Sequence, residues 1–122
     1  MSFSEKSTLK ICACATDKIG GNLLYEYLVS MANEQGITGT TVYRGIKGFD
    51  KNSIFEKLCF WKPAKKCPVI IEMIDKTEVL EEFFKTIETD LRQIPNGCLV
   101  TLNPIEVKIQ KEGNKNQIDQ KN

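Results

Sequence analysis

Residues 69–74 read Val69-Ile70-Ile71-Glu72-Met73-Ile74, and apolar residues at helical spacing come directly after them. Five of these six residues are apolar, which is typical of a strand with little contact to water. Asp75 and Glu78 then have the spacing of a capping box, which indicates a helix start. The stretch therefore predicts a strand followed by an amphipathic helix. The apolar side of this helix would consist of Val79, Leu80, Phe83, Phe84, Ile87 and Leu91.

The first third of the chain has the same order. Residues 8–15 alternate, with Leu9, Ile11, Ala13 and Ala15 on one face and Lys10, Cys12 and Cys14 on the other, which predicts a strand. The stretch Asp17-Lys18-Ile19-Gly20-Gly21-Asn22 predicts a turn that caps a helix, and Gly36 predicts its end. Residues 40–43, Thr-Thr-Val-Tyr, are expected to form the next strand. The helix between them would be built on Leu24, Tyr27, Leu28, Met31 and Ala32.

The end of the chain predicts a last strand and a tail. After a turn at Pro95-Asn96-Gly97, residues 98–102 and 105–109 form either one strand broken at Asn103-Pro104 or two short strands. Residues 110–122 are almost entirely polar, and we expect them to be a disordered tail with no function. One folded domain over residues 8–109 follows.

Two successive β-α-β units predict the α+β class with the ferredoxin-like, split βαβ plan: one antiparallel sheet with both helices on one face. The other face of the sheet has no element of this chain to cover it. Since the strand at 69–74 is apolar on both faces, we expect a second copy to cover it, so the chain should be a homo-oligomer.

Charge and composition exclude several classes of function. Seventeen basic and sixteen acidic residues nearly cancel among 122, so the chain lacks the positive field of nucleic-acid or anionic-membrane binders. No apolar run suits membrane insertion, and the opening residues Met-Ser-Phe-Ser-Glu-Lys-Ser do not resemble a signal peptide, which predicts a cytoplasmic protein. An odd number of cysteines, five, favours free thiols in a reducing compartment.

The stretch Gly36-Ile37-Thr38-Gly39-Thr40-Thr41-Val42-Tyr43-Arg44-Gly45-Ile46-Lys47-Gly48-Phe49 resembles the signature of the PII-like family catalogued as domain of unknown function one-ninety. The runs at 23–26, 68–75 and 97–102 also fall where that family has similar residues, so the resemblance covers roughly residues 9–109. It implies a ferredoxin-like homotrimer related to the PII signal-transduction proteins. Those proteins bind adenine nucleotides between subunits and contact partners, among them membrane transport proteins, through a long loop.

A candidate ligand site lies at the exit of the predicted strand 40–43. Arg44 and Lys47 could neutralise a phosphate, while Gly45 and Gly48 let the backbone approach an anion, with Phe49 next to them. The competing interpretation is a tight strand exit that needs glycine for positive φ, flanked by solvated cations. The resemblance makes the two interpretations equally weighted.

The connection from Lys47 to Cys67 is the candidate partner-binding loop. It is far longer than the usual loop of about 4–6 residues, and it is rich in aromatic and basic residues. Its candidate contact residues are Phe55, Leu58, Phe60, Trp61 and Lys62. Alternatively, these side chains pack on their own domain or on a neighbouring subunit.

Catalytic and metal-binding patterns are weak. The chain has no histidine, which excludes Ser–His and Cys–His pairs, and Cys12 and Cys14 lack the spacing of a zinc site. We therefore expect neither a catalytic residue nor a required cofactor or metal. The leading hypothesis is a regulatory trimer that binds a small anionic effector, such as an adenine nucleotide. The alternatives are a trimer that binds its partner without a ligand and, less favoured, a small enzyme or metal-handling trimer.

Overall fold

The computed structural model describes residues 5–45, 48–49, 54–55 and 67–113. In chain order the elements are β1 (Lys6–Cys14), β2 (Lys18–Ile19), β3 (Asn22–Leu23), α1 (Leu24–Glu34), β4 (Gly39–Arg44), β5 (Gly48–Phe49), β6 (Ile54–Phe55), β7 (Pro68–Lys76), α2 (Thr77–Gln93) and β8 (Leu99–Ile105).

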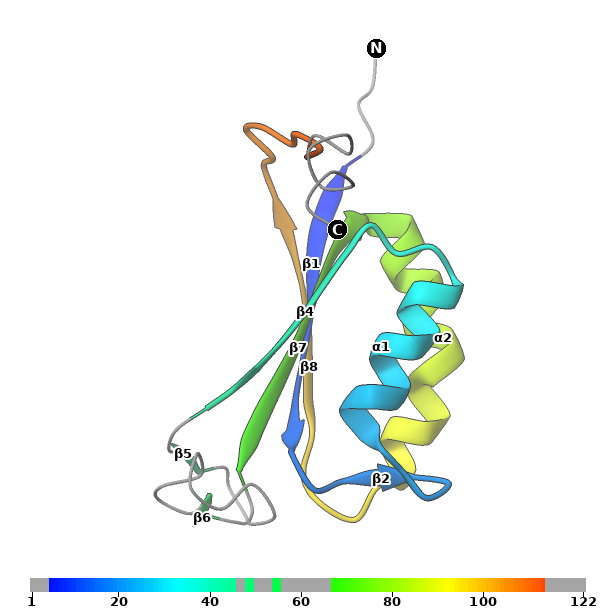
Figure 1. Cartoon of the computed structure of the whole chain (residues 1–122), viewed down its shortest axis with the longest axis vertical. Coiled ribbons are helices and arrows are strands. Elements are labelled where there is room, and N and C mark those ends of the chain that lie inside the picture. Colours follow the sequence, from blue (N-terminus) through cyan, green and yellow to red (C-terminus); the bar gives the residue numbers. More distant parts are fainter. Residues whose placement is uncertain (1–4, 46–47, 50–53, 56–66, 114–122) are drawn as a thin grey trace, which may run out of the picture.

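The main sheet has four strands in the order β4-β7-β1-β8, and every neighbouring pair is antiparallel. Both helices lie on one face of this sheet (Figure 1). The central strand β1 pairs with β7 on one side and with β8 on the other, so β4 and β8 are the outer strands. The α+β, ferredoxin-like fold predicted from the sequence is confirmed.

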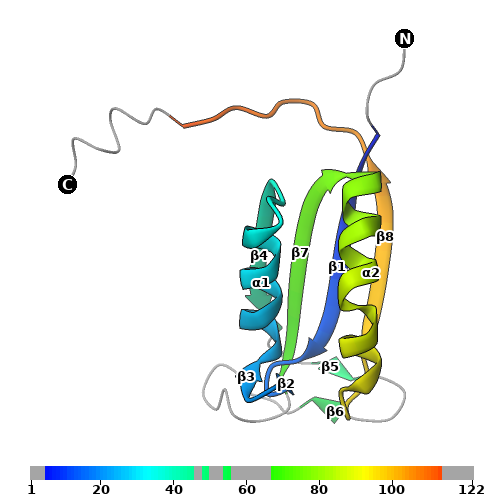
Figure 2. The same ribbon diagram turned by 90° about the vertical axis from the view of Figure 1, so that its right-hand side faces the viewer.

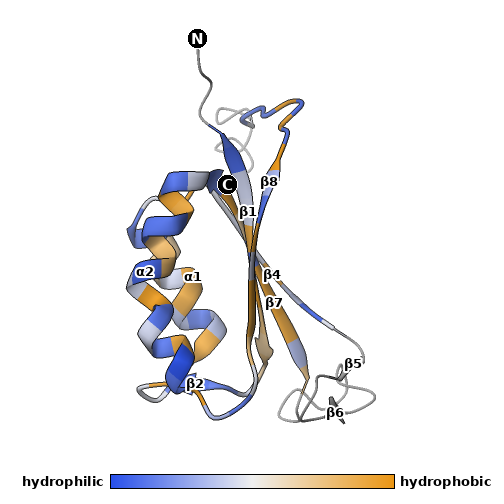
Figure 3. Cartoon of the chain, turned by 180° about the vertical axis from the view of Figure 1, so that it is seen from behind, coloured by the Kyte–Doolittle hydropathy of each residue, from blue (hydrophilic) through white to orange (hydrophobic). Residues whose placement is uncertain are grey.

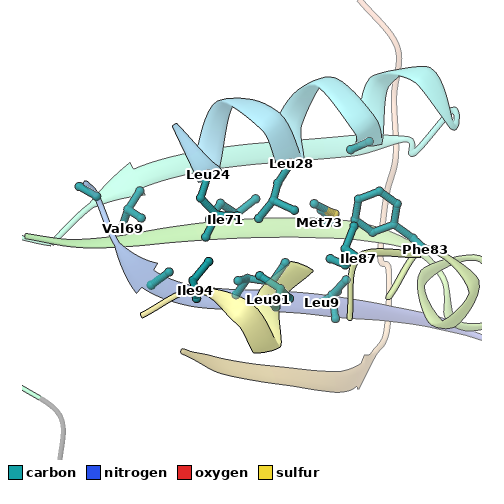
Figure 4. Packing of buried hydrophobic residues seen from close by; sticks show 14 of the residues in the cluster. Leu9, Leu24, Leu28, Val69, Ile71, Met73, Phe83, Ile87, Leu91 and Ile94 are labelled. Atoms are coloured by element: carbon teal, nitrogen blue, oxygen red, sulfur yellow. The ribbon is translucent and has the colours of Figure 1, made fainter. Parts of the chain in front are cut away.

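The core lies between the sheet and the two helices (Figure 4). Alternate residues of β1 and β7, among them Leu9, Ile11, Ile71 and Met73, are almost fully buried there. Hydrophobic residues run along β7, whereas the outer side of α2 is largely hydrophilic (Figure 3). The strand and helix periods of the sequence therefore point the same residues inward. From the helices, the core receives Leu24, Leu28, Ala32, Leu80, Phe83, Ile87 and Leu91.

The sheet face away from the helices is only partly polar. Lys10 and Glu72 form an ion pair at its centre, with 3.7 Å between Nζ and Oε2. Around this pair lie apolar side chains with no cover from the described part of the chain: Ile74 is 40% exposed, Tyr43 43% and Leu99 64%. This open face therefore has the mixed character that the strand at 69–74 predicted.

The start of α2 differs from the predicted capping box. Asp75 belongs to β7, and the N-cap residue Lys76 makes no side-chain cap hydrogen bond. The backbone N–H of Thr77 donates instead to the carbonyl of Glu5, with an N–O distance of 2.8 Å. The Asp75 carboxylate accepts hydrogen bonds from Thr38, because that residue begins the approach to β4 beside the end of β7. Asp75 thus connects two strands rather than capping a helix.

The first turn is more elaborate than predicted. Between β1 and α1 the chain forms the short hairpin β2–β3, which turns at Gly20 and Gly21 with φ of 55° and 87°. Helix α1 has Leu23 at its N-cap without a side-chain cap, and the backbone carbonyl of Asp17 accepts from the N–H of Leu24 instead. The predicted helix end is confirmed, since Gly36 follows α1 with φ of 78°.

The last strand also differs from both predicted forms. β8 runs without a break through Asn103 and Pro104, which a strand paired on one side only can accommodate. Residues 106–113 are not in a strand, so the expected extension to residue 109 is wrong. Of the predicted tail, residues 110–113 are irregular and exposed, and residues 114–122 lie outside the described residues.

Candidate functional site

The predicted ligand site lies at one end of the sheet. Here β4 ends at Arg44, β7 begins at Pro68, and β1 passes into the hairpin β2–β3. The short strands β2, β5 and β6 also lie at this end of the molecule (Figure 1). The last turn of α2 and the connection to β8 reach the same end (Figure 2). Several chain segments that are far apart in sequence therefore meet at this end of the sheet.

Gly45 is held against the start of β7. Its N–H donates to the carbonyl of Pro68, with an N–O distance of 2.8 Å. A Cβ atom added to Gly45 would lie 2.6 Å from Cγ of Pro68, closer than real contacts allow. Gly45 is not among the positive-φ glycines of the described chain, so close approach requires glycine here rather than backbone conformation. The positive-φ explanation of this glycine is wrong.

Arg44 is exposed at the last position of β4, where its backbone pairs with Val69. Among the residues that the structure describes, none forms a salt bridge with Arg44. Lys47 lies outside the described residues. Gly48 and Phe49 form β5, which pairs with β6 so that Gly48 is opposite Phe55. Backbone pairing thus brings two predicted ligand residues beside one residue of the predicted partner-binding loop.

The rest of that loop cannot be placed, because Leu58, Phe60, Trp61 and Lys62 lie outside the described residues. Its two ends are fixed. The carbonyl of Cys67 accepts from the N–H of Ala15 at 2.7 Å, and Cys67 itself is fully buried. Before the loop, the N–H of Gly45 donates a hydrogen bond to the carbonyl of Pro68. Gly45 and Pro68, which precede and follow the loop in the chain, therefore lie side by side at this end of the sheet.

The opposite edge of the sheet carries a cavity that sequence reasoning missed. It has a volume of about 470 Å³ and lies between α2 and β8, at the same end as Arg44. Apolar side chains lie beside polar groups in it, a mixture common in small-molecule sites. No motif signals it, because its residues come from a helix flank, a turn and a strand start. Its lining consists of Phe84, Glu88, Leu91, Arg92, Ile94, Asn96, Cys98 and Val100.

Asp17 and Asn96 hold the chain beside this cavity. Asp17 is 3% exposed; its Oδ2 accepts from the N–H of Cys14 at 3.1 Å, and its Oδ1 accepts from Nδ2 of Asn96 at 2.7 Å. Arg92 and Glu88 form an ion pair across one helical turn at the rim, with 2.7 Å between Nη2 and Oε2. Through Asp17, the turn after α2 is hydrogen-bonded to the residue that ends β1.

Cys98 is not an activated nucleophile. Cys98 is exposed, but partial desolvation of its thiol, the nearby Asp17 carboxylate and Cys12 together raise the pKa of that thiol to about 11. The thiol is therefore protonated near neutral pH, and a protonated thiol is a weak nucleophile. In the described part of the chain, no group of three histidine, cysteine or acidic residues is placed to hold a metal ion. Cys12, Cys14, Cys67 and Cys98 form no disulfide with one another.

No helix within the described residues is long and apolar enough to cross a membrane.

Comparison with known proteins adds three findings. The family model DUF190, described as Uncharacterized ACR, matches residues 6–107. A UPF0166 protein of Aquifex aeolicus (strain VF5) is 32% identical over 107 residues, covering 88% of this chain and 97% of that protein. A UPF0166 protein of Methanocaldococcus jannaschii is 33% identical over 96 residues, covering 75% of this chain and 88% of that protein.

The fold also resembles a solved structure. CPII, a nitrogen regulatory PII-like protein from Thiomonas intermedia K12, was determined bound to ADP, AMP and bicarbonate. It aligns with a TM-score of 0.59 at 12% sequence identity, over 83% of this chain and 88% of that chain. At this identity the likeness concerns the fold, which is therefore PII-like.

Proposed function

Because the chain belongs to the DUF190 family and has a PII-like fold, we propose that it is a regulatory homotrimer that binds an adenine nucleotide. Binding is signalled to a partner protein through the connection between residues 47 and 67. The observation that carries this proposal is the position of two candidate half-sites on the sheet. The Arg44–Gly45 strand exit and the α2–β8 cavity lie at the same end of the sheet but at opposite edges.

A trimer would bring the two half-sites together. If three copies turn their open faces inward, the β4 edge of one copy lies beside the β8 edge of the next, since the outer strands of each sheet differ. The strand exit of one copy then faces the cavity of its neighbour. The exposed Ile74 and Tyr43 of the open face support this arrangement, because it would remove them from water.

The chemistry of each half-site fits one part of a nucleotide. Arg44 and Lys47 supply the positive charge that a phosphate needs. The mixed lining of the cavity offers apolar side chains to pack on a heteroaromatic base and polar groups to bond its edge. Gly45 has a positioning role, because its N–H is already bonded to Pro68. Gly48 and Phe49 complete the proposed contact surface. The nucleotides bound to CPII support adenine as the base.

The position of the site explains how occupancy would reach a partner. Arg44 precedes the start of the loop by three residues. Gly45, just before the loop, and Cys67, at its end, are hydrogen-bonded to Pro68 and Ala15. A phosphate that engages residues 44–49 acts on the loop at one fixed end. It shifts the loop between docking and non-docking conformations. Phe55, Leu58, Phe60, Trp61 and Lys62 form the proposed contact with a partner, a membrane transport protein or another regulated protein.

Thermal unfolding with a panel of nucleotides tests this proposal against a trimer that binds its partner without a ligand. ADP and AMP should raise the melting temperature with increasing concentration, because a ligand that binds only the folded state stabilises it. Adenosine, which lacks phosphate, should cause a smaller shift at equal concentration. If no nucleotide shifts the transition at millimolar concentration, the proposed effector class is wrong and constitutive partner binding is favoured.

A further inference from the structure

Residues 106–113 form an arm, defined here as the described segment after β8, that carries apolar side chains without burying them. Val107 is 40% exposed and Ile109 is 80% exposed; Lys108 separates them, and Glu106 and Gln110 flank them. This alternation would place both apolar residues on one side of an extended segment. Seen from the helix side, the arm crosses from β8 past the edge of β4 (Figure 2). It therefore leaves its own domain with two apolar side chains presented to solvent.

A groove of matching character lies along β8. Two helices do not cover four strands: α1 and α2 contact β1, β4 and β7, so the helix-facing side of the outer strand β8 is left partly open. A hollow of about 250 Å³ results, and it continues into the larger cavity through Phe84 and Val100. Among the strands that the structure describes, β8 pairs with β1 only, so its outer backbone edge has no partner strand among them. The hollow is lined by Leu9, Leu80, Glu81, Phe84, Val100, Thr101 and Leu102.

The charges of arm and groove are complementary. Glu81 borders the groove and also lines an adjoining hollow with Glu5 and Glu78. None of these three carboxylates forms a salt bridge within the described residues. The arm carries Lys108 and Lys111, and Lys108 is engaged only in an exposed pair with Glu106, which is worth little. Docking of the arm would bring basic side chains to an acidic rim.

We propose that the arm of one copy docks in the β8 groove of a neighbouring copy, with Val107 and Ile109 against its apolar lining. The arm runs from β8 past the β4 edge of its own sheet (Figure 2). The trimer of the proposed function places the next copy's β8 beside that edge. This proposal therefore depends on that trimer. The contact joins two different surfaces, so repeating it around a three-fold axis closes a ring. The nucleotide cavity at the lower end of the groove stays available.

Site-specific photo-cross-linking tests the arm without assuming a register. The substitution Ile109→p-benzoylphenylalanine places a photoreactive ring at the most exposed apolar position of the arm. We expect irradiation to join copies covalently, with attachment sites within residues 80–84 or 100–102. A mixture of ¹⁴N- and ¹⁵N-labelled protein distinguishes links between copies from links within one chain. Glu82→p-benzoylphenylalanine, on the outer side of α2, is the control and should give at least tenfold less product.

Links within one chain, links to the open face of β4, β7 and β1, or a yield no higher than that of the control would overturn the arm proposal. Light scattering on the same samples separates this outcome from failure of the proposed function. A trimeric mass without groove links rejects only the arm contact. A monomeric mass rejects both the arm contact and the trimer.

Discussion

At the scale of single residues, Gly45 is a position that the sequence singled out and whose need for glycine the structure explains. The sequence identified it as a glycine at a strand exit, and the structure gives a steric reason, the 2.6 Å approach to Cγ of Pro68. No sequence pattern could supply that reason, because Pro68 lies on the far side of a long connection. The same holds for Asp17 and Asn96, which are 79 residues apart and hydrogen-bonded.

The substitution Gly45→Ala should destabilise the protein by about 1–3 kcal/mol, because the added methyl group must displace the Pro68 ring or the strand end. Gly39→Ala, at the first residue of β4, is the matched control: the nearest neighbour of its added Cβ would be the carbonyl oxygen of Ile74 at 4.0 Å, an ordinary contact. Urea unfolding of both variants measures the difference. Equal stabilities would show that the close approach at Gly45 is easily relieved.

Replacing Arg44 and Lys47 together with alanine should weaken nucleotide binding by about a hundredfold or more. Each charge-assisted hydrogen bond contributes roughly 1.5–3 kcal/mol, and the nearly neutral chain offers no compensating field. Calorimetric titration with ADP measures the loss, while light scattering checks that the double variant keeps its mass. Lys85→Ala removes an exposed cation from α2 and should leave affinity unchanged. Full affinity in the double variant would place the phosphate elsewhere.

At the scale of elements, local pattern predicts the order of strands and helices well and predicts their ends poorly. Helical spacing identified both helices, and alternation, β-forming residues and an apolar run identified the strands of the sheet. The errors lie where tertiary contacts decide. Helix α2 begins without the predicted capping box, because the Asp75 carboxylate accepts a hydrogen bond from Thr38. The N–H of Thr77 donates instead to the carbonyl of Glu5. The sequence predicted a turn at Gly20 and Gly21 but not the hairpin β2–β3 around it, and it gave no sign of the α2–β8 cavity.

Asp75 should contribute to stability as a connection between β7 and the entry to β4. Burial alone would raise the pKa of its carboxyl, but hydrogen bonds from the N–H groups of Lys76 and Thr38 and from the Thr38 hydroxyl lower it. Asp75→Ala should therefore cost about 1–3 kcal/mol at neutral pH. Glu78→Ala, the other half of the predicted capping box, should cost less than about 0.5 kcal/mol.

The same contacts give Asp75 a defined pH dependence. Its pKa in the folded protein lies below its value in the unfolded chain, so its stabilisation is complete above the unfolded value, about 3.9. This stabilisation is lost as the pH falls from there through the folded pKa. Unfolding of wild type and Asp75→Ala should accordingly converge at strongly acidic pH. A difference that persists there would assign the effect to packing rather than to the ionised carboxylate.

The end of the chain divides into two parts with different expected effects. Deleting residues 110–122 should change neither the mass nor the melting temperature, because Val107 and Ile109, the apolar residues with which the arm is proposed to dock, remain. The deleted sequence is almost entirely polar, and the exposed charge of Lys111 contributes little. Within the described residues, Lys6 Nζ donates to Oε1 of Gln110 at 3.1 Å, and this hydrogen bond is exposed. Light scattering and thermal unfolding measure both quantities. A clear loss in either would show that the deleted segment is docked.

At the scale of the whole molecule, one chain forms the core of the fold but leaves apolar side chains of the open face exposed. The open face carries an ion pair surrounded by apolar side chains, and the two halves of the proposed ligand site lie at opposite edges of the sheet. Sequence reasoning reached the first point from the two-sided apolar strand at 69–74. It could not reach the second, because the cavity depends on how α2 lies over β1 and β7. Assembly is therefore central to the proposed function.

Native mass spectrometry in the presence of ADP tests assembly and binding in one measurement. The proposed function predicts a trimer that takes up as many as three nucleotides, one at each junction between copies. The Arg44→Ala/Lys47→Ala variant should appear as a trimer without bound nucleotide at the same ADP concentration. A monomer, a dimer, or a wild-type trimer that binds no ADP at millimolar concentration would contradict the proposal.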